Sequence, residues 1–403
     1  MAEPAGARGP VLDVLTAFLR LGCTSFGGPV AHLGYFRADL VQRRGWLDEA
    51  GFADIVALCQ FLPGPASSQT AMAIGMLRAG LPGGLAAWAS FTLPSAVLMT
   101  GFAYGVSLVG DVAHAAWLHG LKIVAVAVVA QAVWGMGRTL CPDRLRASMA
   151  VGAAIMALAV PSAAGQVGAI AVGGVIGWLA LPAPAVPPGG LLQFGVRRRA
   201  GVVALAVFFA LLAGLPLLVA AGGGHALALL DRFFRAGALV FGGGHVVLPL
   251  LQQAVVPPGW IGPDAFLAGY GAAQALPGPL FSFAAYLGAA MGPAPSGLAG
   301  ATLCLVAIYL PSFLLLVGVL PFWDALRRRA AVQSALLGVN ATVVGLLLAA
   351  LYTPVWTSAI TGRADFAIGL AAFLALAVWQ LPPWLVVLLG GVAAAALGWL
   401  HAA

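Results

Sequence analysis

Long apolar runs, separated by short polar stretches, follow one another along almost the whole chain. An α-helix of about 20 apolar residues crosses the ~30 Å hydrocarbon core of a bilayer. The pattern therefore predicts an all-α polytopic membrane protein. We expect nine spanning helices, over about residues 85–109, 114–136, 149–160, 165–181, 201–221, 298–320, 333–352, 366–379 and 384–400.

Other apolar segments are short and are interrupted by proline and glycine. A first break, Pro63-Gly64-Pro65, interrupts the apolar residues 52–77, and a second break, Pro277-Gly278-Pro279, interrupts residues 266–290. Two half-length helices joined by such a break predict a re-entrant hairpin, whose tip is tolerated at membrane depth only when it is buried in protein or lines a polar cavity. A glycine pair at Gly27-Gly28 and another at Gly242-Gly243 predict one further hairpin in each half.

These features belong to one unit that occurs twice. Five of the six residues from Gln60 to Pro65 recur from Gln274 to Pro279 at an offset of 214 residues, and Phe26-Gly27-Gly28 recurs at an offset of 215. Matches at nearly the same offset are Trp46 with Trp260, Ser68 with Ser282, Leu93-Pro94-Ser95 with Leu310-Pro311-Ser312, and Gly120 with Gly338. A register that drifts so little indicates a duplicated gene. We expect a first repeat over residues 11–181, a linker over 182–225 and a second repeat over 226–401.

The linker contains one apolar segment, Gly201–Ala221, that has no counterpart in either repeat. One extra crossing between two equal halves makes the second half enter the membrane upside down. Arginines cluster at residues 138–146, 197–199 and 327–329, and cytoplasmic loops carry an excess of Arg and Lys. The pattern predicts two inverted-topology repeats, a plan common among secondary transporters, with a cytoplasmic N-terminus and an external C-terminus.

Composition supports a membrane class and excludes several others. The chain is 62% hydrophobic and 8% charged, with a mean hydropathy of +1.02, whereas a soluble domain carries about a quarter charged residues. The net charge of +7 comes from arginines between apolar runs, so we expect no nucleic-acid partner. The four cysteines form no pair at metal-ligand spacing, and the chain lacks a Walker loop, an H-E-x-x-H and a G-x-S-x-G. We therefore expect neither an enzyme nor a cofactor nor a metal.

The groups that could bind a ligand are positive charges and the dipoles at helix starts. A half-helix begins after each break, and a helix start presents free N–H groups and about half a positive charge, which suits an anion. Ser67, Ser68 and Ser282 add hydroxyl groups there. The alternative is that each break only caps a tight loop.

Full positive charges inside apolar segments are a sharper signal. Arg20 and Arg235 both lie six residues before a Phe-Gly-Gly, and burial of arginine costs about 2.5–3.5 kcal/mol on insertion scales, so function is the default hypothesis. A guanidinium fork matches two oxygens of a tetrahedral oxyanion. The alternative is snorkelling to the interface, or pairing with Asp13 and Asp231. Lys122, the only lysine, is either a ligand or a snorkelling residue.

Paired amides and one histidine complete the candidates. Gln60 and Gln274 precede the two breaks and could satisfy freed backbone groups or touch substrate. His245 lies beside the second Phe-Gly-Gly, and a proton role is a hypothesis for it. The expected substrate-binding residues are Arg20, Gly27, Gly28, Gln60, Pro63, Gly64, Pro65, Ser67, Ser68, Lys122, Arg235, Gly242, Gly243, Gln274, Pro277, Gly278, Pro279 and Ser282.

The combination of motifs resembles the chromate ion transporter family. The resemblance rests on the repeated Phe-Gly-Gly, on Gly45-Trp46 and Gly259-Trp260, and on the repeated Gln-x-Leu-Pro-Gly-Pro. It implies a bacterial inner-membrane protein that exports chromate and so confers chromate resistance. The chain departs from strict repetition at Gly244, where the first repeat has Pro29.

Several alternatives stay open beside chromate export. One is uptake or exchange of sulfate, an expected competitor of chromate, or of another anion. The other, from a different class, is a membrane scaffold or receptor that transports nothing and whose breaks merely pack. The expected surroundings are the lipid bilayer, and a homodimer is a further hypothesis.

Overall fold

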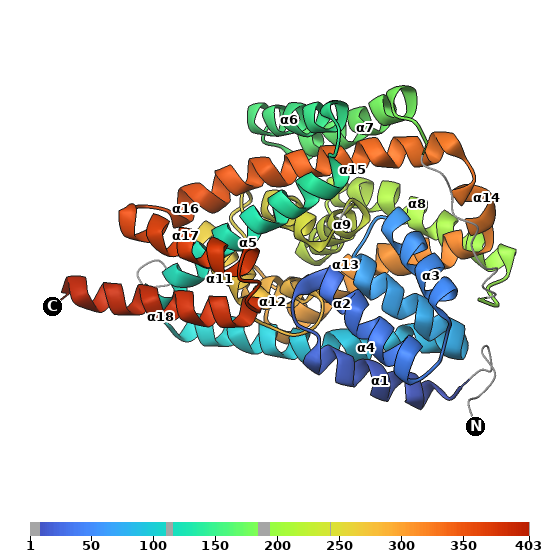
Figure 1. Ribbon diagram of the computed structural model, residues 1–403, viewed down its shortest axis with the longest axis horizontal. Helices are drawn as coiled ribbons and strands as arrows, with labels where there is room; N and C mark the ends of the chain where they lie inside the picture. Colours follow the sequence, from blue (N-terminus) through green and yellow to red (C-terminus); the bar gives the residue numbers. More distant parts are fainter. Residues whose placement is uncertain (1–8, 110–115, 184–193, 242, 403) are drawn as a thin grey trace.

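The computed structural model describes residues 9–109, 116–183, 194–241 and 243–402, and these residues form helices and no strand (Figure 1). The first half contains α1 (Val11–Thr24), α2 (Gly28–Phe36), a π-helix η1 (Arg37–Arg43), α3 (Glu49–Phe61), α4 (Ala66–Val109), α5 (Ala116–Leu140), α6 (Arg144–Ala159) and α7 (Ala163–Ala180). Helix α8 (Arg198–Ala220) connects the halves.

The second half repeats this order with more interruptions. It contains α9 (His225–Ala238), η2 (Gly244–Val246), α10 (Val247–Val255), α11 (Pro263–Gln274), η3 (Leu280–Ser282), α12 (Phe283–Ala290), α13 (Gly297–Val319), η4 (Leu320–Phe322), α14 (Trp323–Arg327), α15 (Ala330–Ala350), η5 (Leu351–Trp356), α16 (Thr357–Ala359), α17 (Arg363–Ala377) and α18 (Pro383–Ala402). The all-α polytopic class predicted from the hydrophobic pattern is confirmed.

Five helical stretches of the described chain are long and apolar enough to cross a membrane: 66–108, 116–140, 198–220, 297–327 and 330–359. They coincide with five of the nine predicted spans. The other four predicted spans correspond to α6, α7, α17 and α18, which are not among these five. The count of nine crossings therefore stays a prediction.

The half-length helices predicted around the breaks are present. Helix α3 ends at Phe61 and α4 begins at Ala66, while α11 ends at Gln274 and η3 begins at Leu280. In the first repeat the half-helix and the next span join at Gly80, whose φ of +66° favours glycine, so the predicted separation of 66–77 from 85–109 is a kink within α4. In the second repeat the same two pieces are separate, as α12 and α13.

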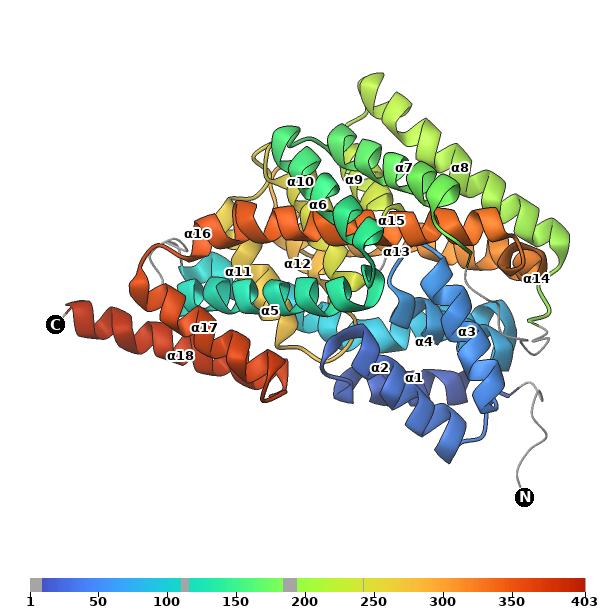
Figure 2. The same ribbon diagram turned by 45° about the horizontal axis from the view of Figure 1, so that its top comes forward.

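Each repeat packs its last two helices against the other repeat. Helices α6 and α7 contact α15, and helices α17 and α18 contact α5 (Figure 2). A Cβ added at Gly120 would lie 2.5 Å from the Gly390 carbonyl oxygen, and one added at Gly338 would lie 2.1 Å from that of Gly173. Small residues let membrane helices approach closely. The two glycines matched in sequence therefore serve matched close contacts, and the repeats interlock.

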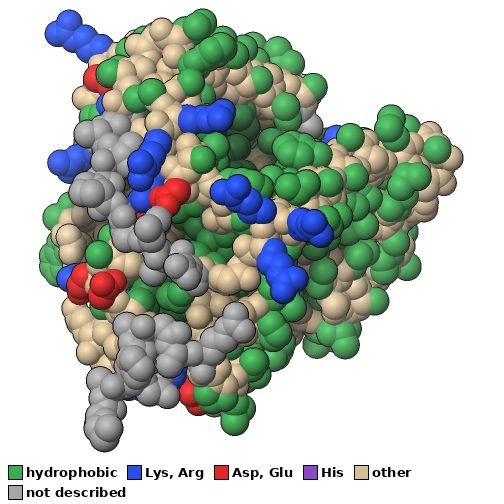
Figure 3. Space-filling model, turned by 90° about the vertical axis from the view of Figure 1, so that its right-hand side faces the viewer, with side chains coloured by type: hydrophobic (Ala, Val, Ile, Leu, Met, Phe, Trp, Pro, Cys, Tyr) green, Lys and Arg blue, Asp and Glu red, His purple; other side chains and the backbone are tan. Residues whose placement is uncertain are grey.

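Basic side chains gather at one end of the molecule. Figure 3 shows Lys and Arg side chains on the end where Figure 1 places α14. Exposed Arg328 and Arg329 follow α14, and exposed Arg198 and Arg199 open α8, whose Gly201 lies against Pro321 of η4. Two of the three arginine clusters therefore share this end.

Candidate functional site

Each Pro-Gly-Pro break is bonded to the segment before the glycine pair of the other repeat. The Gly64 amide donates to the Val240 carbonyl oxygen at 2.6 Å, and the Gly278 amide donates to the Ser25 carbonyl oxygen at 2.8 Å. Val240 and Ser25 each precede a Phe-Gly-Gly, so the two hydrogen bonds are equivalent under exchange of the repeats. Four motifs that are far apart in the sequence are thereby joined in two matched pairs.

The glycines of both breaks have a conformation and surroundings that require glycine. Gly64 has a φ of +127° and Gly278 a φ of +91°, in the region that side chains disfavour. A Cβ on Gly64 would lie 2.4 Å from the Ser312 hydroxyl oxygen, and one on Gly278 would lie 3.0 Å from that of Ser95. Ser95 and Ser312 are themselves matched between the repeats. Each break therefore packs against a serine of the opposite repeat.

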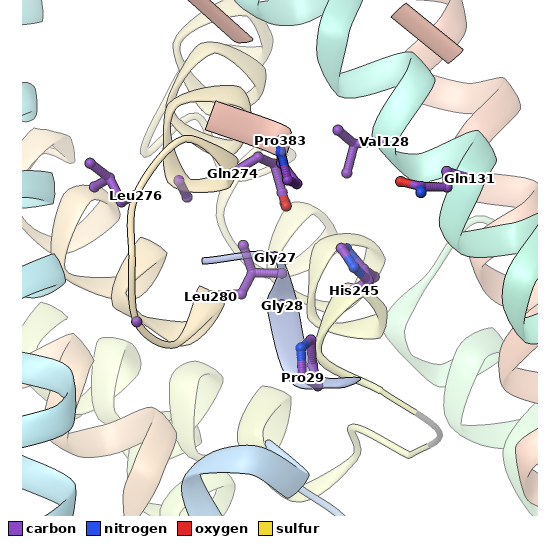
Figure 4. Close-up of a pocket in the computed structure, with 12 residues that line it drawn as sticks. Gly27, Gly28, Pro29, Val128, Gln131, His245, Gln274, Leu276, Leu280 and Pro383 are labelled. Carbon is purple, nitrogen blue, oxygen red and sulfur yellow. The ribbon is translucent and has the colours of Figure 1, made fainter. Parts of the chain in front are cut away.

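A cavity of about 60 Å³ lies between the motif tips (Figure 4). A water needs roughly 10–15 Å³ of such volume, so the space suits a few waters or one small polyatomic ion. Its lining residues come from both repeats and are Gly27, Gly28, Pro29, Val128, Gln131, His245, Ala273, Gln274, Leu276, Gly278, Leu280 and Pro383. The cavity thus joins the first glycine pair to the second break.

Three polar side chains face this cavity from different elements (Figure 4). Gln274, at the end of α11, has a buried Nε2 without a hydrogen-bond partner. Gln131 of α5 donates its Nε2 to the Leu376 carbonyl oxygen at 3.1 Å, which leaves its Oε1 for the cavity. His245 of η2 has its Nδ1 3.0 Å from the Tyr270 hydroxyl. The site therefore combines the free Nε2 of Gln274, the Oε1 of Gln131 and an imidazole held by Tyr270.

The backbone contributes donors beside these side chains. Gly27 is the N-cap of α2 with a φ of +95°, and Gly28 is the first residue of that helix. The first N–H groups of a helix have no partner within it and carry partial positive charge. Because both glycines line the cavity, the start of α2 gives it an electropositive wall.

The first break is closed by protein groups. Gln69 Nε2 donates to the Pro63 carbonyl oxygen at 2.8 Å, and the Ser67 hydroxyl lies 3.3 Å from His32 Nδ1. The Ser68 hydroxyl lies 3.5 Å from that of Tyr309. Gln69 thus satisfies backbone freed by the break, a role the sequence suggested for Gln60, whose side chain is exposed.

The structure brings four predicted residues to the cavity, namely Gly27, Gly28, Gln274 and Gly278. The other predicted residues of the breaks and half-helix starts surround the tips without lining the cavity: Gln60, Pro63, Gly64, Pro65, Ser67, Ser68, Gly243, Pro277, Pro279 and Ser282. Gly242 lies outside the described residues. Whether any of these residues binds substrate stays a prediction.

The three predicted cations lie elsewhere. Arg20 is exposed on α1, and Arg235 is partly exposed and paired with the buried Asp231, four residues earlier. Lys122 is buried, and its Nζ lies 2.7 Å from Asp264 Oδ1 of α11. The structure therefore favours the pairing alternative for Arg235, and it gives Lys122 an ion pair between the repeats in place of a free ammonium group.

Two polar residues of the site were missed from the sequence. Gln131 is the only glutamine within the apolar α5, a signal that could have identified it, and Tyr270 lies one helical turn before Gln274 on α11. Neither has a matched partner in the other repeat, so the repeated pattern does not mark them.

Comparison with known proteins places the chain in a defined group. The family model described as Chromate transporter matches residues 12–178 and 227–396, which shows the two repeats. A chromate transport protein of Pseudomonas aeruginosa is 31% identical over 96% of this chain and 92% of its own length. A chromate transport protein of Cupriavidus metallidurans is 28% identical over 83% and 80%, and a probable one of Synechococcus elongatus is 26% identical over 90% and 88%. No solved structure matches the chain.

Proposed function

This chain belongs to the chromate transporter family, and from that premise we propose that it is a secondary transporter that carries chromate across the bacterial inner membrane. The observation that carries the proposal is the convergence of the first glycine pair and the second break on one polar cavity formed by both repeats. A scaffold that only packs would gain nothing from the unpartnered Nε2 of Gln274 at that position.

Chromate is a tetrahedral dianion, and its removal from water needs donors at several oxygens. The free Nε2 of Gln274 and the backbone N–H of Gly28, at the start of α2, supply donors on different sides of the cavity. No Asp or Glu is among the residues that line it. This arrangement supports an anion and disfavours a metal cation.

Alternating access is the proposed cycle. The cavity opens beside the second break, whereas the first break is closed by Gln69 and the serines around it. Matched hydrogen bonds join the two halves. If the two breaks exchanged their surroundings, the second break would close and the first would open. In an inverted repeat this exchange turns the site from one side of the membrane to the other.

The proposed direction is efflux, which would give chromate resistance.

Two arginine clusters share the end at which α1 begins, and positive charge marks the cytoplasmic side, so we propose a cytoplasmic N-terminus (Figure 1). The alternatives within transport are uptake or exchange of chromate, or carriage of sulfate, which has the same shape and charge.

Chromate flux in inside-out membrane vesicles tests the function. We expect uptake of radioactive chromate, partial competition by sulfate, and loss of uptake after addition of a protonophore. Vesicles that carry the protein and accumulate no more chromate than empty ones would exclude chromate export. Stronger transport of sulfate than of chromate would reassign the substrate.

Arg20→Gln is expected to leave initial chromate flux within about twofold of wild type. The side chain is exposed on α1 and is not among the residues that line the cavity, so its replacement should leave the cavity unchanged. The measurement is flux in vesicles at matched protein level. A loss of flux at normal expression would show that Arg20 contributes to transport.

Asp264→Asn is expected to lower stability by about 1–3 kcal/mol, because it leaves the buried Lys122 ammonium without its partner. Thermal unfolding of the purified protein in detergent measures the effect. The double variant Lys122→Met with Asp264→Asn should recover much of the loss, since no unpaired buried charge then remains at this contact. Equal stability of all three proteins would show that the ion pair contributes nothing.

A further inference from the structure

We propose that His245 takes up a proton when the oxyanion enters the cavity, so that anion and proton bind together. The inference rests on the proposed function and adds the cation that the site otherwise lacks. Histidine is suited to this task because its unperturbed pKa lies near neutral pH.

The cavity lacks fixed charge among the described residues that line it. None of the described lining residues is Lys, Arg, Asp or Glu. The buried cations of the described chain lie elsewhere: Lys122 is paired with Asp264, Arg327 with Asp54 and Asp324, and Arg78 lies over the ring of Trp46. Amide groups and a helix start provide only partial charges, and an unpaired buried dianion is costly. His245 is the one lining residue that can become a full cation.

The imidazole ring of His245 has one nitrogen held by a hydroxyl. Nδ1 lies 3.0 Å from the hydroxyl of Tyr270, which is fully buried on α11. A hydroxyl both donates and accepts, so Tyr270 can donate to the neutral ring and accept from the charged one. No partner is found for Nε2 among the described residues, and the ring lies across the cavity from Gln274 (Figure 4). A protonated Nε2 can therefore donate to an anion.

The surroundings contain no competing titratable group. Helices α10 and α15, which contact η2, carry no Asp, Glu, Lys, Arg or His. On α5, Lys122 is paired with Asp264, His119 with Asp365, and Arg138 is exposed near the end of the helix. On α2, His32 contacts Ser67. Tyr270 is thus the titratable group in hydrogen-bond contact with His245.

The site is present once per chain. The position matched to His245 in the first repeat is Val30, and His32 is committed to Ser67 beside the closed break. The balance is simple: one proton from the aqueous side and one dianion enter together, no bond within the anion changes, and both leave together. The loaded carrier then holds one negative charge less than the anion alone would bring.

Calorimetry of the purified protein tests proton uptake directly. Anion binding is titrated in two buffers that differ in ionisation enthalpy, with selenate at pH 6–8 and chromate at pH 7.5–8.5, where each anion remains dianionic. We expect wild type to take up close to one proton per anion at the upper pH, with affinity falling up to tenfold per pH unit. His245→Gln should take up none and should bind about tenfold more weakly at the lower pH.

Two further variants keep the test decisive. His119→Gln removes a histidine paired with Asp365 and should keep wild-type uptake. Tyr270→Phe retains His245 but removes its hydroxyl partner, so the pH midpoint of binding should move even if His245→Gln fails to fold. Wild type that takes up no proton with either anion, or equal uptake in His245→Gln, overturns the inference. If wild type takes up no proton but still transports chromate in vesicles, only the role of His245 is excluded. If wild type shows neither anion binding nor chromate flux, the proposed function is excluded as well.

Discussion

Gly278→Leu and Gly64→Leu should each abolish chromate flux, with a loss of at least about a hundredfold, while the protein still reaches the membrane. Both glycines have positive φ, and a branched residue in that region costs about 1–3 kcal/mol before any clash. The added side chain would also meet Ser95 or Ser312 of the other repeat. The hydrogen bonds to Ser25 and Val240, which join the repeats, would then be lost.

Gly101→Leu is the matched control for these two variants. Gly101 lies within α4, and a Cβ there meets nothing within 4 Å. The same substitution should therefore leave flux unchanged. Flux is measured in inside-out vesicles and normalised to the amount of membrane-inserted protein. Normal chromate resistance in both Gly64→Leu and Gly278→Leu would show that the breaks only cap loops and have no part in transport.

Gln274→Leu should lower chromate transport roughly 10- to 100-fold, because a hydrogen bond to a charged group contributes about 1.5–3 kcal/mol. The Nε2 group of Gln274 is buried, lacks a protein partner and lines the cavity. Leucine has a similar volume but offers no donor. The loss should appear in the concentration dependence of initial flux.

Gln60→Leu supplies the control within the same motif. Gln60 matches Gln274 in sequence but is exposed on α3, so its substitution should leave transport near wild type. The repeat alone predicts equal effects of the two changes, whereas the structure predicts unequal ones. Equal losses would show that the two repeats contribute alike to the site.

The sequence predicts the helical elements well because their causes are local. Apolar runs near membrane thickness give the five long helices, and Pro-Gly-Pro ends α3 and α11 close to the expected residues. Matched positions such as Gly120 and Gly338 also have matched contacts, since a duplicated gene preserves the packing of each copy. The predicted count of nine crossings depends on the shorter helices, whose length does not decide whether they cross.

The sequence identifies part of the lining of the cavity. The glycine pair, Gln274 and Gly278 were identified because they are repeated and lie at breaks. Two of the predicted cations, Arg235 and Lys122, have acidic partners, and the Asp264 that binds Lys122 is 142 residues away in the sequence. A charge in an apolar run indicates that a partner is needed and does not identify that partner.

By itself the sequence determined where helices run, where they break and that the unit occurs twice, because periodicity, proline and glycine act on neighbouring residues. Only the tertiary structure decided which tip bonds to which, that Gln69 and not Gln60 closes the first break, and that the cavity lies beside the second. The bonds between the tips join residues far apart in the sequence, 253 positions in the case of Gly278 and Ser25. Two nearly identical motifs can therefore have different surroundings, and the difference arises from packing between the repeats.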